Sequence, residues 1–321
     1  MKENILQVVA AILLGLMIPG AIIRLTATNP DPVSPEDPTQ SSYTQENAQT
    51  GIWVLTEDGN TQWMILEEYL TGVILAEMPT SYEHDALCAQ AAVARTYALK
   101  RQQGSRHPMG AVCTDPSCCQ AYIDVARYLD GHGYEEDVNK ARAATEDTKG
   151  MVVTYQGDLI EATYYHCSGG RTEEAVAVWG VDYPYLQVVE SPGEEDMDGY
   201  AESVSYSRGE LESMLGRELP GDPKNWLSWT TYTVGGGVEH MLFAGIQYTG
   251  VELRKLLELN STVFTMTPQG DGLRIDTLGK GHRVGMSQTG AQAMALAGNT
   301  WQQIIAHYYP GTRIDKMEDV G

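Results

Sequence analysis

The pattern of apolar and polar residues divides the chain into an apolar N-terminal segment, a polar linker and a long mixed region. Residues 5–23 are almost continuously apolar and are flanked by Lys2 and Arg24. Because about 20 such residues span a bilayer, we predict that residues 1–26 form a single transmembrane anchor. A cleaved signal peptide is the alternative, with a passable cleavage site at 25–27, but a basic residue directly after the apolar run is unusual there.

The polar linker covers residues 27–50. It carries Pro30, Pro32, Pro35 and Pro38 among Ser, Thr, Gln and acidic residues. A segment of this composition cannot bury a core and stays extended. We therefore predict a tether that holds the folded part of the chain away from the membrane.

The mixed region, residues 51–313, shows helical periodicity at both ends and strand-like patterns between them, and 314–321 is predicted to be a tail. The predicted helices cover 67–76, 84–103, 251–259, 287–297 and 300–308. The predicted strands cover 151–155, 159–164, 230–234, 241–248, 263–267 and 273–277, with a hairpin signal at 156–158. Because helices and strands are segregated without regular alternation, the predicted fold class is α+β, in one large region of one or two lobes.

Composition narrows the classes of function. The formal net charge is -22, which argues against a nucleic-acid partner because phosphate binding requires clustered Lys and Arg. The same charge repels anionic polymers over roughly a Debye length, about 8–10 Å. A polymeric substrate is therefore expected to bind in a local groove, and the acidic run 190–202 is interpreted as a solvated loop.

Glu77 is the candidate catalytic residue. It closes an apolar helical stretch that Pro79 terminates, because proline cannot donate a backbone hydrogen bond and biases Met78 away from helix. A carboxylic acid fixed at a helix end and partly screened from water can keep its proton near neutral pH and act as a general acid. Position alone favours the alternative, an ordinary last-turn glutamate on a solvated face.

The five cysteines, Cys88, Cys113, Cys118, Cys119 and Cys167, allow two interpretations. Outside the cytoplasm they can form disulfides, with at least one thiol left over. Alternatively His107, Cys113 and Cys119, spaced by six residues in a loop, supply a zinc-type ligand set. Spacing does not decide between the two. Cys88 lies beside the apolar face of the second helix and is expected to be a buried thiol.

Several motifs in order resemble those of the stage II sporulation protein D family, from about residue 53 to residue 312. They are LEEYL and AEMP (66–79), ALCAQAAVARTYA (86–98), CQAY (119–122), ATYYHCSGG (162–170), VWG and YPYL (178–186), GMSQ (285–288) and HYYPG (307–311). The family's Gly-His-Gly before the GMSQ block is replaced by Gly281-His282-Arg283. This bulky cation stands where glycine would permit a close approach, so a difference in subsite geometry is expected.

The resemblance implies a membrane-anchored lytic transglycosylase that cuts peptidoglycan glycan strands during spore engulfment, with Glu77 as the matching catalytic glutamate. One carboxylic acid protonates the glycosidic oxygen, the sugar's acetamido group stabilises the cationic centre, and the carboxylate then removes the C6 hydroxyl proton. The product is a 1,6-anhydro sugar, whereas ordinary glycosidases use two carboxylates. The runner-up is a non-catalytic, peptidoglycan-binding amidase enhancer, and a structural scaffold is a third interpretation.

The resemblance also suggests supporting residues. It places the family's counterpart of Arg95 near the active site, and we expect Arg95 and Gln90 to contact substrate or backbone oxygens, although either could be structural. Six residues are candidates for substrate binding: Arg95, Gln90, Tyr122, Ser168, Ser287 and Gln288. Some family members hold zinc through one His and two Cys, which favours a structural zinc on His107, Cys113 and Cys119, with water, Cys118 or Asp115 as fourth ligand.

The expected partners follow from the same resemblance. They are peptidoglycan glycan strands, the membrane through the anchor, and a membrane-anchored cell-wall amidase that removes stem peptides; no nucleic acid and no organic cofactor are expected. The expected location is a single-pass membrane protein with its catalytic domain outside the cytoplasm, in the space between the mother cell and forespore membranes.

Overall fold

The computed structural model describes residues 50–104 and 106–320. The predicted anchor, 1–26, and all of the predicted tether except Thr50 lie outside these residues. Among the residues described, no helix combines the length and the apolar character needed to cross a membrane.

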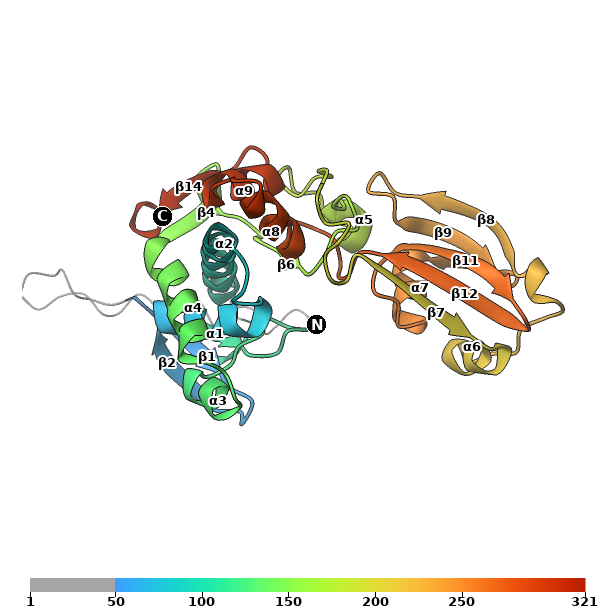
Figure 1. Ribbon diagram of the computed structural model, residues 1–321, viewed down its shortest axis with the longest axis horizontal. Coiled ribbons are helices and arrows are strands. Elements are labelled where there is room, and N and C mark those ends of the chain that lie inside the picture. Colours follow the sequence, from blue (N-terminus) through green and yellow to red (C-terminus); the bar gives the residue numbers. More distant parts are fainter. Residues whose placement is uncertain (1–49, 105, 321) are drawn as a thin grey trace, which may run out of the picture. The chain divides into compact units, whose positions relative to one another are not determined.

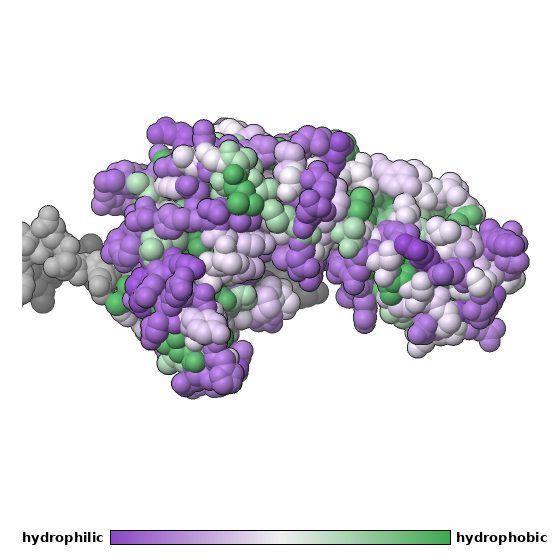
Figure 2. Space-filling view, in the orientation of Figure 1, coloured by the Kyte–Doolittle hydropathy of each residue, from purple (hydrophilic) through white to green (hydrophobic). Residues whose placement is uncertain are grey.

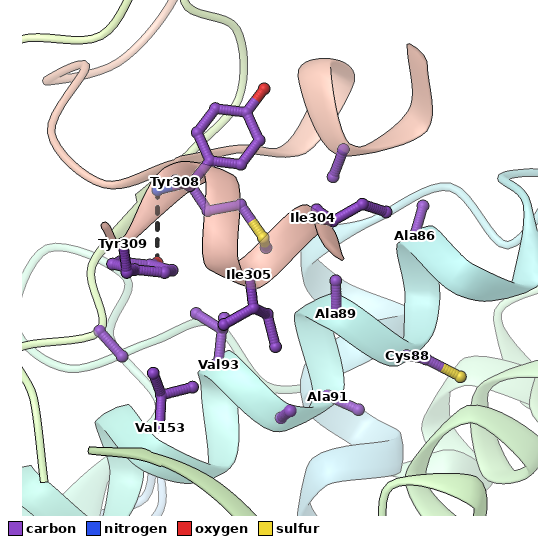
Figure 3. Close-up of a cluster of buried hydrophobic side chains, with 14 of the residues drawn as sticks. Ala86, Cys88, Ala89, Ala91, Val93, Val153, Ile304, Ile305, Tyr308 and Tyr309 are labelled. Carbon is purple, nitrogen blue, oxygen red and sulfur yellow. Dashed lines mark hydrogen bonds between the residues drawn. The ribbon is translucent and has the colours of Figure 1, made fainter. Parts of the chain in front are cut away.

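Helix α2 (His84–Gln103) is the centre of the larger core. It contacts α1 (Leu66–Glu77), α4 (Glu135–Asp147), α8 (Gln288–Leu296) and α9 (Trp301–Tyr308) (Figure 1). Alanines make up much of its buried surface, and small side chains allow neighbouring helices to approach closely. Figure 3 shows Ala89 and Val93 of α2 facing Ile304 and Ile305 of α9.

Short strands surround these helices. β1 (Gly51–Leu55) pairs with β2 (Thr61–Ile65) and with β3 (Val112–Cys113). β4 (Met151–Tyr155) lies between β5 (Asp158–Leu159) and β14 (Arg313–Lys316), and β6 (Tyr164–Tyr165) runs parallel to β13 (Met286–Ser287). The remaining short helices are α3 (Val125–Asp130), α5 (Ala175–Trp179) and the 3₁₀ turns Pro108–Gly110, Pro223–Asn225 and Met317–Asp319.

A second core lies within residues 201–278. One sheet has the order β11 (Val263–Gln269), β12 (Gly272–Leu278), β7 (Ala201–Tyr206), and the other has β10 (Ile246–Thr249), β9 (Val238–Phe243), β8 (Leu227–Tyr232). Helices α6 (Arg208–Leu215) and α7 (Gly250–Leu256) pack with them around Trp226, Phe243 and Ile275. The ends of the segment meet, because Ala201 is opposite Leu278 and the Gly279 N–H donates to Tyr200 O at 2.8 Å.

The structure confirms the α+β class and the two helices that flank Glu77, and it corrects three boundaries. The strand predicted at 159–164 is two short strands, β5 and β6, in different sheets. The strand predicted at 241–248 is a hairpin, because Ala244 and Gly245 both have positive φ and form a two-residue turn between β9 and β10. The predicted tail, 314–321, begins inside strand β14, which pairs with β4.

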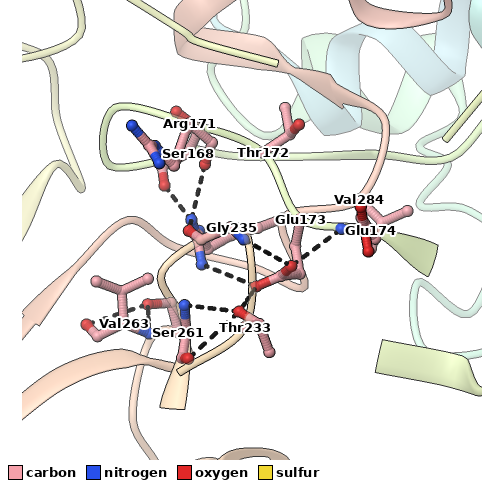
Figure 4. A network of polar contacts seen from close by, with 12 residues as sticks. Ser168, Arg171, Thr172, Glu173, Glu174, Thr233, Gly235, Ser261, Val263 and Val284 are labelled. Carbon is pink, nitrogen blue, oxygen red and sulfur yellow. Dashed lines mark hydrogen bonds and ion pairs between the residues drawn. The ribbon is translucent and has the colours of Figure 1, made fainter. Parts of the chain in front are cut away.

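Arg283, which replaces the family's glycine, is buried in a polar network. Figure 4 shows its neighbours Ser168, Arg171, Glu173 and Gly235. The φ of Arg283, 66°, is in the left-handed region that favours glycine. The side chain donates to the carbonyls of Ser168 (2.8 Å), Arg171 (2.8 Å) and Gly235 (2.7 Å) and lies 3.8 Å from the Glu173 carboxylate. The cation is therefore bonded inside the protein, and it does not line the pocket described below.

The visible surface is largely hydrophilic. On the face that Figure 2 shows, hydrophilic residues cover most of the area and apolar residues form small separate patches.

Candidate active site

Glu77 is the last residue of α1 and borders a pocket of 710 Å³. The helix ends there because Met78 is extended (φ -132°, ψ 143°) before Pro79. The Met78 N–H still bonds to Ile74 O at 3.0 Å, so the last turn is well formed. The helix terminus therefore fixes the Glu77 backbone, at the helix end that the sequence predicted, while its side chain reaches the pocket.

Burial raises the pKa of the Glu77 carboxyl above its ordinary value. The Ala121 N–H (2.8 Å) and the Tyr164 hydroxyl (3.2 Å) both donate to Oε1 and lower the pKa, but burial has the larger effect. The Gln288 amide lowers it further, although no hydrogen bond of normal length joins the two side chains. Oε2 has no hydrogen-bond partner within the described part of the chain, so this oxygen is available to a ligand.

A chain of hydrogen bonds supports Glu77 from the core. The Tyr164 hydroxyl lies 3.0 Å from Gln120 Oε1 as well as 3.2 Å from Glu77, and Gln120 Nε2 donates to the buried Tyr69 hydroxyl at 2.9 Å. A phenol has one proton, so Tyr164 can donate to only one acceptor at a time. It can donate to Glu77 when the carboxyl is ionised and to Gln120 when the carboxyl carries its own proton.

The pocket has an aromatic wall and a basic lining. Trp179 and His282 line it with their rings 5.1 Å apart, and Tyr97, Tyr164, Tyr165 and Tyr183 contribute further rings. Glu161 is the second carboxylate that borders this pocket, and it forms an ion pair with Arg101. Arg254 and Lys280 also line the pocket, so its basic side chains contrast with a chain whose net charge is -22.

The predicted metal ligands lie together beside this pocket. His107 Nε2 is 3.4 Å from Cys118 Sγ and 3.6 Å from Cys119 Sγ, and with Cys113 all four ligand atoms lie within 4.8 Å of one another. None of the five cysteines forms a disulfide, all of them being in the described ranges. Three thiols and one imidazole form a donor set suited to zinc. Cys119 lies two residues before Ala121, whose N–H holds Glu77.

Comparison with known proteins agrees with these motifs. A profile described as "SpoIID: Stage II sporulation protein" matches residues 57–155. Stage II sporulation protein D of Bacillus subtilis (strain 168) is 34% identical over 258 residues, which cover 79% of this chain and 75% of that protein. This chain belongs to the stage II sporulation protein D family.

Two further known proteins are similar to this chain. Stage II sporulation protein D of Bacillus amyloliquefaciens is 33% identical over 82% of this chain and 78% of that protein. The amidase enhancer of Bacillus subtilis (strain 168) is 27% identical over 76% of this chain and 40% of that protein. This chain is therefore similar to proteins with two different names.

The structure does not bring every predicted binding residue to the pocket of this family member. Gln288 lies near Glu77, as described. Arg95 is fully buried, pairs with Glu67, and donates to the carbonyls of Thr145 and Met151 (both 3.1 Å). Gln90 is fully buried, and its amide has no hydrogen-bond partner among residues 50–104 and 106–320. Neither Arg95 nor Gln90 lines the pocket.

Tyr122 also lies away from the Glu77 pocket. Its ring stacks on Tyr69 with centroids 5.4 Å apart and borders a different, smaller pocket with Asp124 and Arg127. The motif that contains it contributes to the active site through Gln120 and the Ala121 N–H instead.

Ser168 and Ser287 bind a buried carboxylate that the sequence analysis misjudged. Glu194 lies in the acidic run predicted to be a solvated loop, but its side chain is completely buried. It accepts hydrogen bonds from the hydroxyls of Ser168, Ser287 and Thr289, the last at 2.9 Å. These contacts join three segments of the chain, so Ser168 and Ser287 stabilise the fold around Glu194.

Tyr164 and Gln120 are the residues at Glu77 that were not singled out from the sequence. Both stand inside the motifs that carried the family resemblance. Nothing in their spacing indicated that two distant motifs would converge on the same carboxylate.

Proposed function

We propose that this protein is a lytic transglycosylase that cleaves the glycan strands of peptidoglycan, with Glu77 as its acid and then its base. The observation that carries the proposal is the state of Glu77, whose pKa burial raises and whose Oε2 has no partner among the described residues. A general acid requires a proton at working pH and an atom free to transfer it.

The proposed reaction needs one carboxyl group. The Glu77 carboxyl protonates the glycosidic oxygen, the C1–O bond breaks, and the sugar's acetamido oxygen stabilises the positive charge at C1. The Glu77 carboxylate then removes the C6 hydroxyl proton while O6 bonds to C1, so no water is consumed. Tyr164 can donate to Glu77 while its carboxylate is ionised between these two steps, and to Gln120 before the first step and after the second.

The second pocket carboxylate does not favour an ordinary glycosidase. Such enzymes need a free carboxylate as nucleophile or as base for water. Glu161 is instead paired with Arg101, which also lies 4.6 Å over the Tyr97 ring. This arrangement supports a role for Glu161 in the pocket wall.

The basic lining supports an anionic sugar as ligand. Muramic acid that has lost its stem peptide carries a free lactyl carboxylate. Arg254 and Lys280 line the Glu77 pocket and could pair with that group. We therefore propose peptide-free strands as the preferred substrate, and we expect Lys280→Met to raise KM for them while leaving kcat less affected.

We propose zinc as a structural cofactor held by His107, Cys113, Cys119 and the neighbouring Cys118. Bound zinc supplies a charge that holds the thiolates and fixes the loop that contains them. Through that loop it would position the Ala121 N–H on Glu77. The chemistry at Glu77 needs no Lewis acid, so the four ligands act on the reaction through position alone.

The anchor, the compartment and the amidase partner complete the proposal. A chain tethered at its N-terminus would act outside the cytoplasm, between the mother cell and forespore membranes. A membrane-anchored amidase there would supply strands without stem peptides. Crosslinking in sporulating cells tests this arrangement, and recovery of the protein from the cytoplasm alone would contradict it.

The test of the activity is the chemical identity of the new chain ends. Purified full-length protein is incubated with peptide-free glycan strands, and mass spectrometry is used to look for 1,6-anhydro-muramic acid ends. We expect these ends with wild type and with Glu161→Gln, and none with Glu77→Gln. Reducing ends that contain added water, lost in Glu161→Gln, would instead indicate a two-carboxylate hydrolase.

The similarity to an amidase enhancer favours one alternative, a binding protein that conditions peptidoglycan for an amidase. In that case strands bind to wild type and to Glu77→Gln equally, and neither forms products. Stimulation of a purified amidase by both forms would then establish the enhancer function.

A further inference from the structure

A second group of metal-ligand side chains lies outside the pocket, where α2 begins and α4 ends. His84 and Cys88 are one turn apart on α2, and Asp147 is the last residue of α4. His84 Nε2 lies 2.8 Å from Asp147 Oδ2 and 3.4 Å from Cys88 Sγ, and the three ligand atoms are all within 4.8 Å of one another.

Hydrogen bonding within the protein satisfies this group only in part. Both neighbours contact the same ring nitrogen, Nε2, which can either donate one proton or accept one. If Nε2 donates to Asp147, it has no lone pair for the Cys88 thiol. If Nε2 accepts a hydrogen bond from the thiol, it has no proton to donate to the Asp147 carboxylate. A cation between the three atoms removes this conflict, because all three groups can present lone pairs to it.

The spacing is close to that of a metal chelate. Residues i and i+4 lie on one face of a helix, so a His and a Cys at 84 and 88 can bind one ion. For tetrahedral zinc, the usual bond lengths place N and S about 3.5 Å apart and N and O about 3.3 Å apart. The nitrogen–sulfur distance of 3.4 Å already agrees, and the nitrogen–oxygen distance of 2.8 Å requires a shift of about 0.5 Å.

Two of the three ligands are accessible to solvent, and the third is fixed in the core. The His84 and Asp147 side chains are 50% and 65% exposed, whereas Cys88 is 1% exposed and held in the core. The exposed Asp147 side chain is therefore free to adjust its position toward an ion.

We propose that His84, Cys88 and Asp147 form a second zinc site that joins the N-terminus of α2 to the C-terminus of α4. It is distinct from the His107 cluster, which follows the other end of α2. Cys113 and Cys119 of that cluster pack with Ala94 and Ala98 in the second half of the helix, whereas His84 and Cys88 lie in its first two turns. Because α4 and α2 both pack on α1, zinc at this position braces the helices behind Glu77. The inference does not depend on the proposed enzymatic activity.

The test counts zinc per chain and needs no substrate. Purified full-length protein is dialysed against a zinc buffer of fixed free concentration, and bound zinc is measured by mass spectrometry for wild type and variants. We expect Cys88→Ala, His84→Gln and Asp147→Asn each to bind about one equivalent less than wild type. Glu146→Gln, which removes the neighbouring exposed carboxylate, is the matched control and should bind as wild type does.

Cobalt provides a second readout that identifies the sulfur ligand. Cobalt bound to a thiolate absorbs in the near ultraviolet by charge transfer, and the Cys88→Ala spectrum should lack part of the wild-type intensity. His84→Gln and Asp147→Asn change exposed side chains, so they keep the test valid if Cys88→Ala fails to fold. Equal zinc counts in wild type, His84→Gln and Asp147→Asn would overturn the proposal.

Discussion

Tyr164→Phe should raise the pKa of Glu77 by about one unit. The substitution removes one hydroxyl, which lies 3.2 Å from Glu77 Oε1 and stabilises the ionised carboxylate. A hydrogen bond to a charged group contributes about 1.5–3 kcal/mol, and one pKa unit corresponds to about 1.36 kcal/mol. Because the same hydroxyl also faces Gln120 at 3.0 Å, the lower end of this range applies.

The assay is a pH titration of the Glu77 carboxyl carbon by ¹³C NMR, with Glu77→Gln used to assign the signal. If the protein has the proposed activity, the alkaline limb of its pH–rate profile should move upward by the same amount, since Glu77 keeps its proton to higher pH. Tyr97→Phe, which changes a nearby pocket phenol not bonded to Glu77, is the control. A Glu77 pKa that stays constant or falls in Tyr164→Phe would refute the hydrogen-bond argument.

Three further predictions concern stability. Burial raises the pKa of Glu77 in the folded state, so the stabilisation that the protonated carboxyl gives the folded state is present below the pKa of the unfolded chain and is lost as pH rises through the pKa of the folded state. Glu77→Gln should therefore raise Tm near about pH 8 but not near about pH 4. An equal shift of Tm at both pH values would contradict this reasoning. Arg95→Met leaves the Glu67 carboxylate without its buried partner, so urea denaturation should show a free energy of unfolding that is lower by about 3 kcal/mol. Replacing both Arg95 and Glu67 by Met should restore most of the lost stability. Chelation should lower the Tm of wild type and of Cys88→Ala more than that of Cys113→Ser, because Cys113→Ser has already lost a ligand of the His107 cluster. An equal decrease in wild type and Cys113→Ser would assign the zinc-dependent stability to another site.

The sequence predicted best where a local pattern decides the outcome. Pro79 ends α1 and thereby places Glu77, and the alanine-rich apolar face predicted α2 between its observed ends. For His107, Cys113 and Cys119 the spacing did not decide, and the family resemblance favoured a ligand cluster; the structure brings these residues together.

The sequence predicted poorly where contacts between distant residues decide the position of a side chain. Glu194 looks solvated within an acidic run, and only the folding of three distant segments around it provides the hydroxyls that allow its burial. Arg95 is close to Glu77 in sequence, but the helix directs its side chain toward Glu67 and α4. Tyr164 reaches Glu77 across 87 positions of sequence, a pairing that no local periodicity encodes.

The segment 201–278 enters and leaves the fold at adjacent points of the backbone, at Tyr200 and Gly279. Such a segment can be lengthened, exchanged or lost in evolution while the helices behind Glu77 keep their packing. It also contributes Arg254, Leu259 and Asn260 to the Glu77 pocket. A single recombination event within it could thus change which polymers a descendant accepts, with the acid itself left in place.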